Sequence, residues 1–170
     1  FEEWGIDCIE RFRGDFAIAL WDARSSRLWL VRDRVGVKPL YYVHVPGGIA
    51  FASEIKALLT LPKIPRRVNQ EALYHYLSFL TPPAPQTMFA GIEKLPAATR
   101  LLVDASGSAR VERYWDPLQR AIPLTGVSER DIAEALLAEL RAAVRYRKVS
   151  DVPVGIFLSG GIDSSVNAAL

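Results

Sequence analysis

Residues 152–165 read VPVGIFLSGGIDSS, and this stretch decides how the second half of the chain is interpreted. Residues 152–158 form a short apolar run, which predicts a buried strand. Ser159–Ser165 then carries two glycines and three serines, which predicts a loop, and the residues from Val166 onward read as a helix. A strand, a loop and a helix in this order indicate a parallel sheet, in which a ligand binds beyond the carboxyl end of the strand.

The loop at residues 159–165 has the composition of a phosphate site. Gly160 and Gly161 let the backbone approach a ligand closely, and the N–H groups at the start of the following helix favour an anion. The loop lacks the Gly-Lys pair of the Walker loop, so we do not expect transfer of a γ-phosphate. Asp163 would repel phosphates unless a divalent cation lay between them, and it therefore predicts Mg²⁺. The alternative is a plain Gly-Gly turn with a Ser or Asp helix cap.

A long helix is expected before this stretch. Ser128 and Asp131 resemble a capping box. Apolar residues then recur at four-residue steps on one stripe, which predicts a core-facing helix that ends at about Arg147; they are Ile132, Leu136, Leu140 and Val144. Four cations near its end favour a solvated face, and they are Arg141, Arg145, Arg147 and Lys148.

The first part of the chain is expected to be rich in strands. Phe16–Trp21 is apolar on both faces, which predicts a strand covered on both sides. Further strands and a hairpin are expected at residues 28–32, 40–45, 49–52, 101–103 and 109–114. Ser53 is a candidate cap for a short helix through Leu61. Asn69 is a candidate cap for a helix on which Leu73, Leu77 and Leu80 share one side.

These elements predict two units: residues 1–115, a linker at 116–127 that contains two prolines, and the start of a second unit at 128–170. The chain has 170 residues, 21 Lys+Arg against 19 Asp+Glu, and 50% hydrophobic residues, which excludes a disordered chain. Its small net charge argues against nucleic acid as a partner, and no apolar run is long enough to span a membrane. Because residue 1 is Phe and the last helix is cut short, we expect an internal piece of a longer protein.

Several single residues could be mistaken for functional ones. Cys8 has no histidine at a recognisable spacing, so a packed, partly buried thiol is the simpler interpretation, and its lack of a partner cysteine suits a reducing compartment. His44 and His75 lack companion ligands at metal spacing, which favours structural roles. The charged residues of segment 32–38 could form an anion patch, but a turn with an internal ion pair is favoured.

The motif at 159–165 resembles the pyrophosphate loop of the ATP pyrophosphatases, and residues 150–158 are similar to the approach to that loop in glutamine-hydrolysing asparagine synthetases. The first unit carries the same resemblance. Its matching stretches are GDFAIALWD at 14–22, RDRVGVKPLYY at 32–42, FASEIKAL at 51–58, GIEKLP at 91–96 and Tyr114-Trp115.

The resemblance implies an α+β unit followed by an α/β unit. The first would be the later part of a four-layer αββα amidohydrolase with an N-terminal Cys nucleophile, and the second would open a parallel-sheet ATP-pyrophosphatase domain. Ammonia from glutamine would amidate aspartate through β-aspartyl-AMP, with release of AMP and pyrophosphate. The implied ATP-binding residues are Leu158, Ser159, Gly160, Gly161, Ile162, Asp163, Ser164 and Ser165, with Asp163 facing Mg²⁺.

No glutaminase catalytic residue is assigned in this chain, because the nucleophile of the family stands upstream of residue 1. The resemblance further implies a cytoplasmic enzyme whose partners are the small molecules glutamine, aspartate and ATP, and it allows a homodimer. Two alternatives stay open: an enzyme of the same architecture that adenylates another carboxylate, such as a β-lactam synthetase or a peptide macrocyclase, and a non-catalytic or RNA-binding module that uses the loop.

Overall fold

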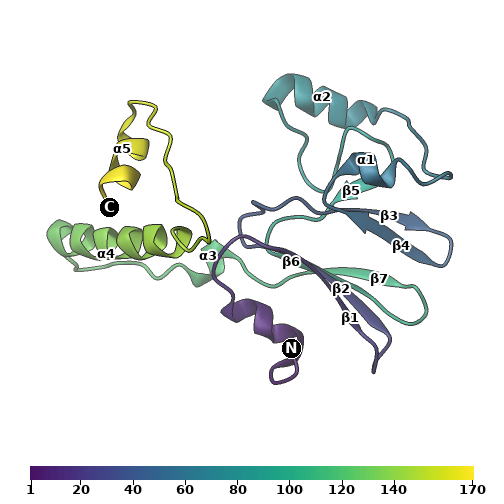
Figure 1. Cartoon of the computed structure of the whole chain (residues 1–170), viewed down its shortest axis with the longest axis horizontal. Coiled ribbons are helices and arrows are strands. Elements are labelled where there is room, and N and C mark those ends of the chain that lie inside the picture. The colour runs from purple at the N-terminus through teal and green to yellow at the C-terminus, as the bar shows by residue number, and fades with distance from the viewer. The chain divides into compact units, whose positions relative to one another are not determined.

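The computed structural model describes all of residues 1–170, which divide into two compact units, Phe1–Arg120 and Ala121–Leu170 (Figure 1). The first unit holds every strand of the chain. The second holds two helices joined by an extended segment. No helix is both long enough and apolar enough to cross a membrane.

Two antiparallel sheets form the first unit. The larger has the strand order β1-β2-β6-β7, with β1 at Ala17–Asp22, β2 at Arg27–Arg32, β6 at Thr99–Val103 and β7 at Ala109–Arg113. The smaller has the order β4-β3-β5, with β3 at Tyr41–Val45, β4 at Gly48–Ala52 and β5 at Ile92–Lys94. The strands expected from the alternation of apolar residues are confirmed, and a tight turn joins β3 to β4, where Val45 pairs with Gly48.

Three apolar clusters hold the first unit together. One fills the space between the sheets and is centred on Leu30, Leu95 and Leu101. A second covers the outer face of the larger sheet, where Ile9 of the 3-10 helix η1 (Gly5–Arg11) packs on Val31. The third covers the outer face of the smaller sheet with Leu58 of α1 (Ile55–Leu58). Each sheet therefore packs one face on the core between the sheets, and its other face carries a further apolar cluster.

The expectation that β1 is covered on both faces is only partly right. Ile18 packs in the outer cluster and Ala17 in the cluster between the sheets. Trp21, however, is 62% exposed. β1 forms one edge of its sheet, so the side chains that pack on the sheet do not extend over Trp21 near the end of the strand.

Two helix caps were predicted in the first unit, and the structure agrees with one of them. The side chain of Asn69 accepts a hydrogen bond from the Ala72 N–H at 3.2 Å, which confirms it as the cap of α2 (Gln70–Phe79). Ser53 does not cap α1: Glu54 occupies the N-cap position without a side-chain bond, and the helix is one turn long. A last short helix, α3, spans Pro117–Arg120.

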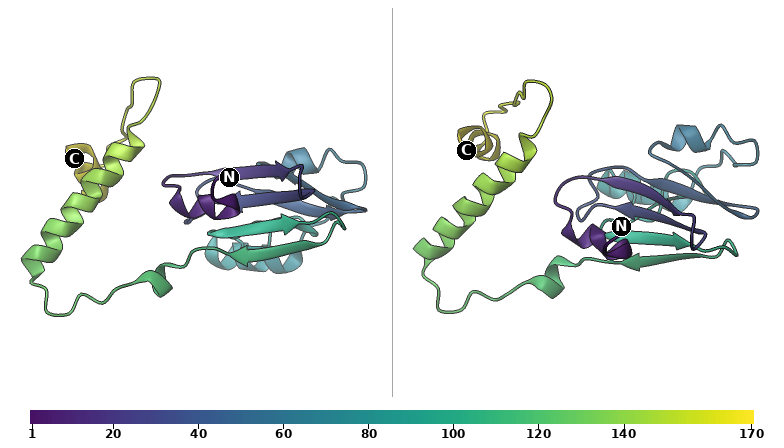
Figure 2. Two further views of the ribbon diagram at one scale, coloured as in Figure 1. Left: turned by 90° about the horizontal axis from the view of Figure 1, so that it is seen from below. Right: turned by 60° about the horizontal axis from the view of Figure 1, so that its bottom comes forward.

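The second unit consists of α4 (Glu129–Arg147), an extended segment and α5 (Ile162–Ala169) (Figure 2). Ser128 caps α4 as predicted, since its hydroxyl accepts from the Asp131 N–H at 3.2 Å. The prediction of a buried strand at Val152–Leu158 is wrong for this structure: the segment is exposed and pairs with nothing, and Phe157 is 98% exposed. No other extended segment of this unit offers an edge for pairing.

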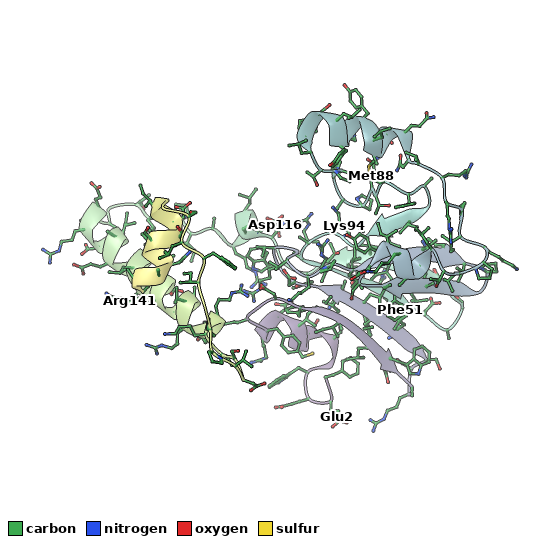
Figure 3. The ribbon with its side chains drawn as sticks, turned by 45° about the horizontal axis from the view of Figure 1, so that its top comes forward. Glu2, Phe51, Met88, Lys94, Asp116 and Arg141 are labelled. Carbon is green, nitrogen blue, oxygen red and sulfur yellow. The ribbon has the colours of Figure 1, made fainter.

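The stripe Ile132–Val144 is not a packed core in this structure. No residue of α4 is buried, and Leu136 is well exposed. The four cations at its C-terminal end are exposed as expected, and Figure 3 labels Arg141 on this helix. The apolar pattern therefore predicted the helix correctly, while its burial depends on partners that these 50 residues do not supply.

Candidate functional site

The loop at residues 159–165 has the backbone that its glycines predicted. Gly160 has a φ of +81°, in the left-handed region that side-chain-bearing residues rarely adopt. Gly161 is the N-cap of α5, in an extended conformation. The chain therefore turns at Gly160 and enters the helix directly after Gly161.

Hydrogen bonds of serine hydroxyls connect the two ends of this loop. The Ser159 and Ser164 hydroxyls lie 3.0 Å apart, and the Ser159 N–H donates to the Ser164 hydroxyl at 3.3 Å. The Ser165 hydroxyl donates to the Gly161 carbonyl at 2.8 Å. The structure thus brings together all three predicted serines, two of them from opposite ends of the loop.

The N-terminus of α5 has no protein cap. The N-cap residue, Gly161, has no side chain that could accept a hydrogen bond from the first turn, so the N–H groups of that turn are available to a ligand. The surrounding residues leave the approach open, since Leu158 and Ile162 are both largely exposed. Free N–H groups combined with the positive end of the helix dipole are suited to an anion.

Asp163 lies in the first turn of α5, beyond the cap position. The alternative that Asp163 or a serine caps the helix is therefore wrong, because Gly161 holds that position without a side-chain bond. No group of three or more His, Cys, Asp and Glu side chains could hold a metal ion in this chain. A single exposed carboxylate still fits Mg²⁺, which is commonly held by one or two carboxylates together with water and substrate phosphates.

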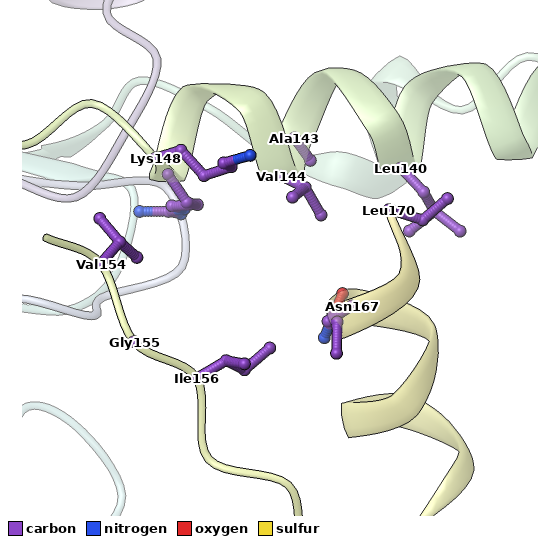
Figure 4. A pocket seen from close by; sticks show the side chains of 11 residues that line it. Leu140, Ala143, Val144, Lys148, Val154, Gly155, Ile156, Asn167 and Leu170 are labelled. Carbon is purple, nitrogen blue, oxygen red and sulfur yellow. The ribbon is translucent and has the colours of Figure 1, made fainter.

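A cavity of about 430 Å³ lies elsewhere in the second unit, between α4, residues 154–156 and α5 (Figure 4). Its lining is mainly aliphatic, with Leu140, Val144 and Ile156 among its walls. No residue of the 159–165 loop lines it. Its walls are suited to packing against apolar groups, and the anion-binding features belong to the loop alone.

The comparisons with known proteins bear on both units. Residues 1–115 match the family described as glutamine amidotransferase domain, which is more than half of the chain. The chain belongs to this family. Residues 135–170 match the asparagine synthase family, so the amidotransferase domain is followed by a segment of a second family. The resemblance found in the motifs is confirmed.

Curated relatives agree with this assignment. A putative glutamine-hydrolysing asparagine synthetase of Mycobacterium tuberculosis is 37% identical over 174 residues, covering 100% of this chain and 27% of the relative. Asparagine synthetase 3 of Bacillus subtilis is 36% identical, covering 99% of this chain and 27% of the relative. The amidase chyE of Penicillium rubens is 34% identical, covering 100% and 25%. The chain thus spans about a quarter of the length of these relatives.

Within the amidotransferase domain, Arg32 and Asp33 do not form the expected ion pair. The Arg32 guanidinium donates instead to the carbonyls of Lys38, Leu95 and Gly36, at 2.8, 2.7 and 2.6 Å. The Asp33 carboxylate accepts from the N–H groups of Val35, Val37 and Lys38. The segment is a turn, as predicted, but it is held by backbone groups, because both side chains are buried where unpaired carbonyl and N–H groups need partners.

Burial raises the pKa of Asp33, but the backbone N–H groups that donate to its carboxylate outweigh this effect and hold the pKa below its ordinary value. The hydroxyl of Tyr114, in the last matched residues of the domain, donates to the Arg32 carbonyl at 2.8 Å. Burial raises the pKa of Tyr114 to about 12. The phenol is therefore neutral at physiological pH and acts as a hydrogen-bond donor.

Sequence reasoning missed one polar pair of the domain. The Tyr42 hydroxyl donates to the Glu93 carboxylate, and burial together with this bond raises the pKa of Tyr42. The two residues face each other across β3 and β5 but lie 51 positions apart in the chain. The pair can be recognised only from the strand register, because two residues 51 positions apart show no sign of contact in the sequence.

The three residues interpreted from the sequence as structural all lie in the first unit. Cys8 is buried beside Ile9 and Trp29 in the outer cluster, more completely than predicted. His44 lies in β3 and His75 in α2, and neither belongs to a metal-binding group.

Proposed function

We propose that the chain is part of a glutamine-dependent asparagine synthetase. In this proposal the domain at residues 1–115 belongs to the glutaminase, with the αββα arrangement of an N-terminal-nucleophile hydrolase. The segment from residue 128 opens the ATP-pyrophosphatase domain. The observation that carries the proposal is the uncapped N-terminus of α5 behind the left-handed Gly160, in the stretch that matches the asparagine synthase family.

The residues of the 159–165 loop then bind the β- and γ-phosphates of ATP. The N–H groups of Ile162 and Asp163 donate to phosphate oxygens, and Gly161 lets the backbone approach them. The hydroxyls of Ser159 and Ser164, now bonded to each other, turn toward the phosphates. This arrangement holds the pyrophosphate group in place while the α-phosphorus is attacked by the aspartate carboxylate, forming β-aspartyl-AMP.

Asp163 would hold Mg²⁺, which when bound neutralises charge on the leaving pyrophosphate. Ammonia released from glutamine by the first domain would then displace AMP from the activated aspartate. In the glutaminase step the part of residues 1–115 would be to form the two sheets around the inter-sheet core.

The proposal is tested in the full-length protein by exchange of labelled pyrophosphate into ATP in the presence of aspartate. Gly161→Val places a branched side chain where phosphate must lie, and Asp163→Asn removes a charged ligand. We expect both to reduce exchange by a hundredfold or more, about 2.7 kcal/mol, while glutamine hydrolysis without ATP is retained. Wild-type exchange in folded Asp163→Asn would show that this carboxylate does not hold the metal.

The similarity to an enzyme named amidase keeps a second candidate open: the same architecture acting on a different carboxylate. In that case pyrophosphate exchange depends on another carboxylic acid and not on aspartate. A panel of carboxylates in the same exchange assay separates the two candidates, because both require an intact loop.

A further inference from the structure

The loop that joins α1 to α2 carries cations that have no counter-charge. Lys63, Arg66 and Arg67 are exposed, and none of the three forms an ion pair. The guanidinium of Arg66 donates only to a backbone carbonyl. Residues 55–70 contain no Asp or Glu, although the chain as a whole is nearly balanced in charge. The segment 63–67, called the basic loop from here on, therefore presents uncompensated positive charge.

The basic loop is held in one conformation by its neighbours. Ile64 is buried in the outer cluster of the smaller sheet. The Arg67 carbonyl accepts from the Ala90 N–H at 2.9 Å, and the Asn69 N–H donates to the Met88 carbonyl at 2.9 Å. Prolines at positions 62 and 65 restrict the backbone further. Binding through these cations therefore loses little backbone entropy.

Helix α2 follows directly and turns an apolar face away from the first unit. Leu77 is 74% exposed and Leu80 is 79% exposed, and Tyr74 is exposed to a similar extent. Leu73 and Tyr76 are exposed as well and complete this side of the helix. In Figure 1, α2 lies at the periphery of the first unit, and no element of that unit covers its outer side. Residues 73, 74, 76, 77 and 80 are called the apolar face of α2 from here on.

The apolar face of α2 contains no charged side chain. The only carboxylate of the helix belongs to Glu71, in its first turn, and lies 3.9 Å from the ring of His75. A helix with leucines and tyrosines on one side and cations beside it is suited to the boundary between lipid headgroups and acyl chains. At such a boundary leucine side chains leave water, tyrosine rings lie among the headgroups with their hydroxyls hydrated, and cations meet anionic headgroups.

A nucleic acid matches these two features less well than a lipid surface does. It would pair with the basic loop and stack bases on Tyr74 and Tyr76, but it would leave the three leucines of the apolar face in water. An acidic protein segment would neutralise the cations and leave the same leucines without a partner. An anionic lipid surface engages the charge and the apolar side chains together.

We propose that the first unit binds an anionic lipid surface through the basic loop and the apolar face of α2. The basic loop pairs with the phosphates and carboxylates of the headgroups, and the leucines of α2 enter the outer part of the acyl layer. Attachment of this kind involves one leaflet and needs no helix that crosses the bilayer. Because either feature alone gives only weak and reversible binding, stable attachment depends on both.

The test is sedimentation of the full-length protein with vesicles of phosphatidylcholine, alone or mixed in equal parts with phosphatidylserine. We expect binding to the mixed vesicles only, and weaker binding at high salt, which screens the headgroup charge. Lys63→Gln, Arg66→Gln and Arg67→Gln combined should weaken binding by roughly a hundredfold, because each cation near an anionic surface contributes about fivefold.

The matched control for charge is the combination of Arg24→Gln, Arg27→Gln and Arg113→Gln. It removes the same number of exposed cations, but from the strands and turns of the larger sheet. Its affinity for the mixed vesicles should stay close to that of the wild type. A loss equal to that of the basic-loop variant would show that binding follows total charge, which contradicts the proposed site.

A second pair of variants tests the apolar face of α2. Leu77→Gln keeps the helix propensity but removes a leucine that would enter the acyl layer, and we expect binding to fall by about tenfold. Leu118→Gln is the matched control, because Leu118 is equally exposed on α3 and lies outside this face. This control should bind like the wild type, and both variants should keep the wild-type midpoint in urea unfolding.

Four other results would overturn the proposal. They are a wild-type protein that does not bind the mixed vesicles, equal binding to phosphatidylcholine alone, and wild-type binding by the basic-loop variant or by Leu77→Gln. The fourth is binding of single-stranded RNA without binding of vesicles, which would show that the basic loop serves a nucleic acid. Strong hydrogen-exchange protection of residues 73–80 without lipid, together with no vesicle binding, would show that protein covers this face. Lipid binding does not involve the 159–165 loop, so its failure leaves the proposed function standing.

Discussion

The turn at residues 32–38 and the loop at residues 159–165 both combine glycine with charged or hydroxyl side chains, but they use their polar groups in opposite ways. In the first, the guanidinium of Arg32 and the carboxylate of Asp33 are paired with backbone groups of the same unit. In the second, the hydroxyls pair only with one another or with loop backbone groups, and the N–H groups of the first helical turn receive no hydrogen-bond acceptor from the cap residue Gly161. A polar turn that satisfies itself stabilises the fold, whereas one with free donors is prepared for a ligand.

The largest expected effect removes the self-satisfied centre of the first turn. Asp33→Ala leaves three N–H groups without their acceptor in a buried place, and we expect it to lower the free energy of unfolding of the first unit by about 3 kcal/mol. All four tryptophans lie in this unit, so tryptophan fluorescence during urea unfolding reports on it alone. Asp163→Ala is the control and should not move this transition. An unchanged urea midpoint for Asp33→Ala would contradict the conclusion that the polar groups of the 32–38 turn stabilise the fold.

The glycines of the two segments provide a second contrast. Gly36 has a φ of +70°, and a Cβ there would lie 3.1 Å from the Ala97 Cβ and 3.2 Å from the Arg32 Cζ. Gly36→Ala therefore combines backbone strain with a clash, and we expect a loss of about 2 kcal/mol in the same unfolding experiment.

Gly160 has a similar φ, but a Cβ at this residue would meet no atom within 4 Å, so Gly160→Ala should cost only the backbone strain, about 1 kcal/mol. The helical signal in circular dichroism reports on this loss. Equal costs for the two glycines would mean that the packing around Gly36 is looser than the structure shows.

The charge of Asp33 should make the first unit sensitive to acid. Its pKa is depressed in the folded state, so the stabilisation is fully present above the unfolded value of about 3.8 and is lost as the pH falls through the lower folded value. Asp33→Asn should cost about 1.5 kcal/mol near pH 7, because an amide oxygen accepts more weakly than a carboxylate. We expect this difference from wild type to shrink below pH 4 in urea unfolding at a series of pH values. A constant difference down to low pH would show that charge plays no part.

A further small effect is expected at the tyrosine that joins the turn to the end of the domain. Tyr114→Phe removes the hydroxyl that donates to the Arg32 carbonyl and keeps the buried ring. We expect a loss of about 1 kcal/mol in the urea unfolding of the first unit. Tyr74→Phe is the matched control, because Tyr74 lies on an exposed helix face, and it should leave the free energy of unfolding unchanged. An equal loss in both variants would contradict a stabilising role for the hydrogen bond between Tyr114 and Arg32.

The sequence predicted elements better than it predicted burial. The alternation in β1 and β2 and the caps at Asn69 and Ser128 are local signals, and the structure follows them. Whether a side chain is buried depends on a second layer. Leu77 and Phe157 look like core residues in the sequence, but neither has a layer against it here.

The site shows the same division. The turn at Gly160 and the helix after Gly161 could be predicted because conformational freedom is a property of the residue itself. The bond between the Ser159 and Ser164 hydroxyls, the backbone partners of Arg32 and the Tyr42–Glu93 pair depend on how distant segments or the ends of a loop meet. No spacing in the sequence carries that information.

The most direct test of the central claim is hydrogen–deuterium exchange of the full-length protein with and without ATP and Mg²⁺. We expect ATP to slow exchange of the backbone N–H groups in residues 159–165 and to leave residues 32–38 unchanged, because only the first set has donors free to bind phosphate. Gly161→Val should abolish the protection. The account would be contradicted by ATP binding that leaves the 159–165 loop unprotected, or by equal protection in Gly161→Val.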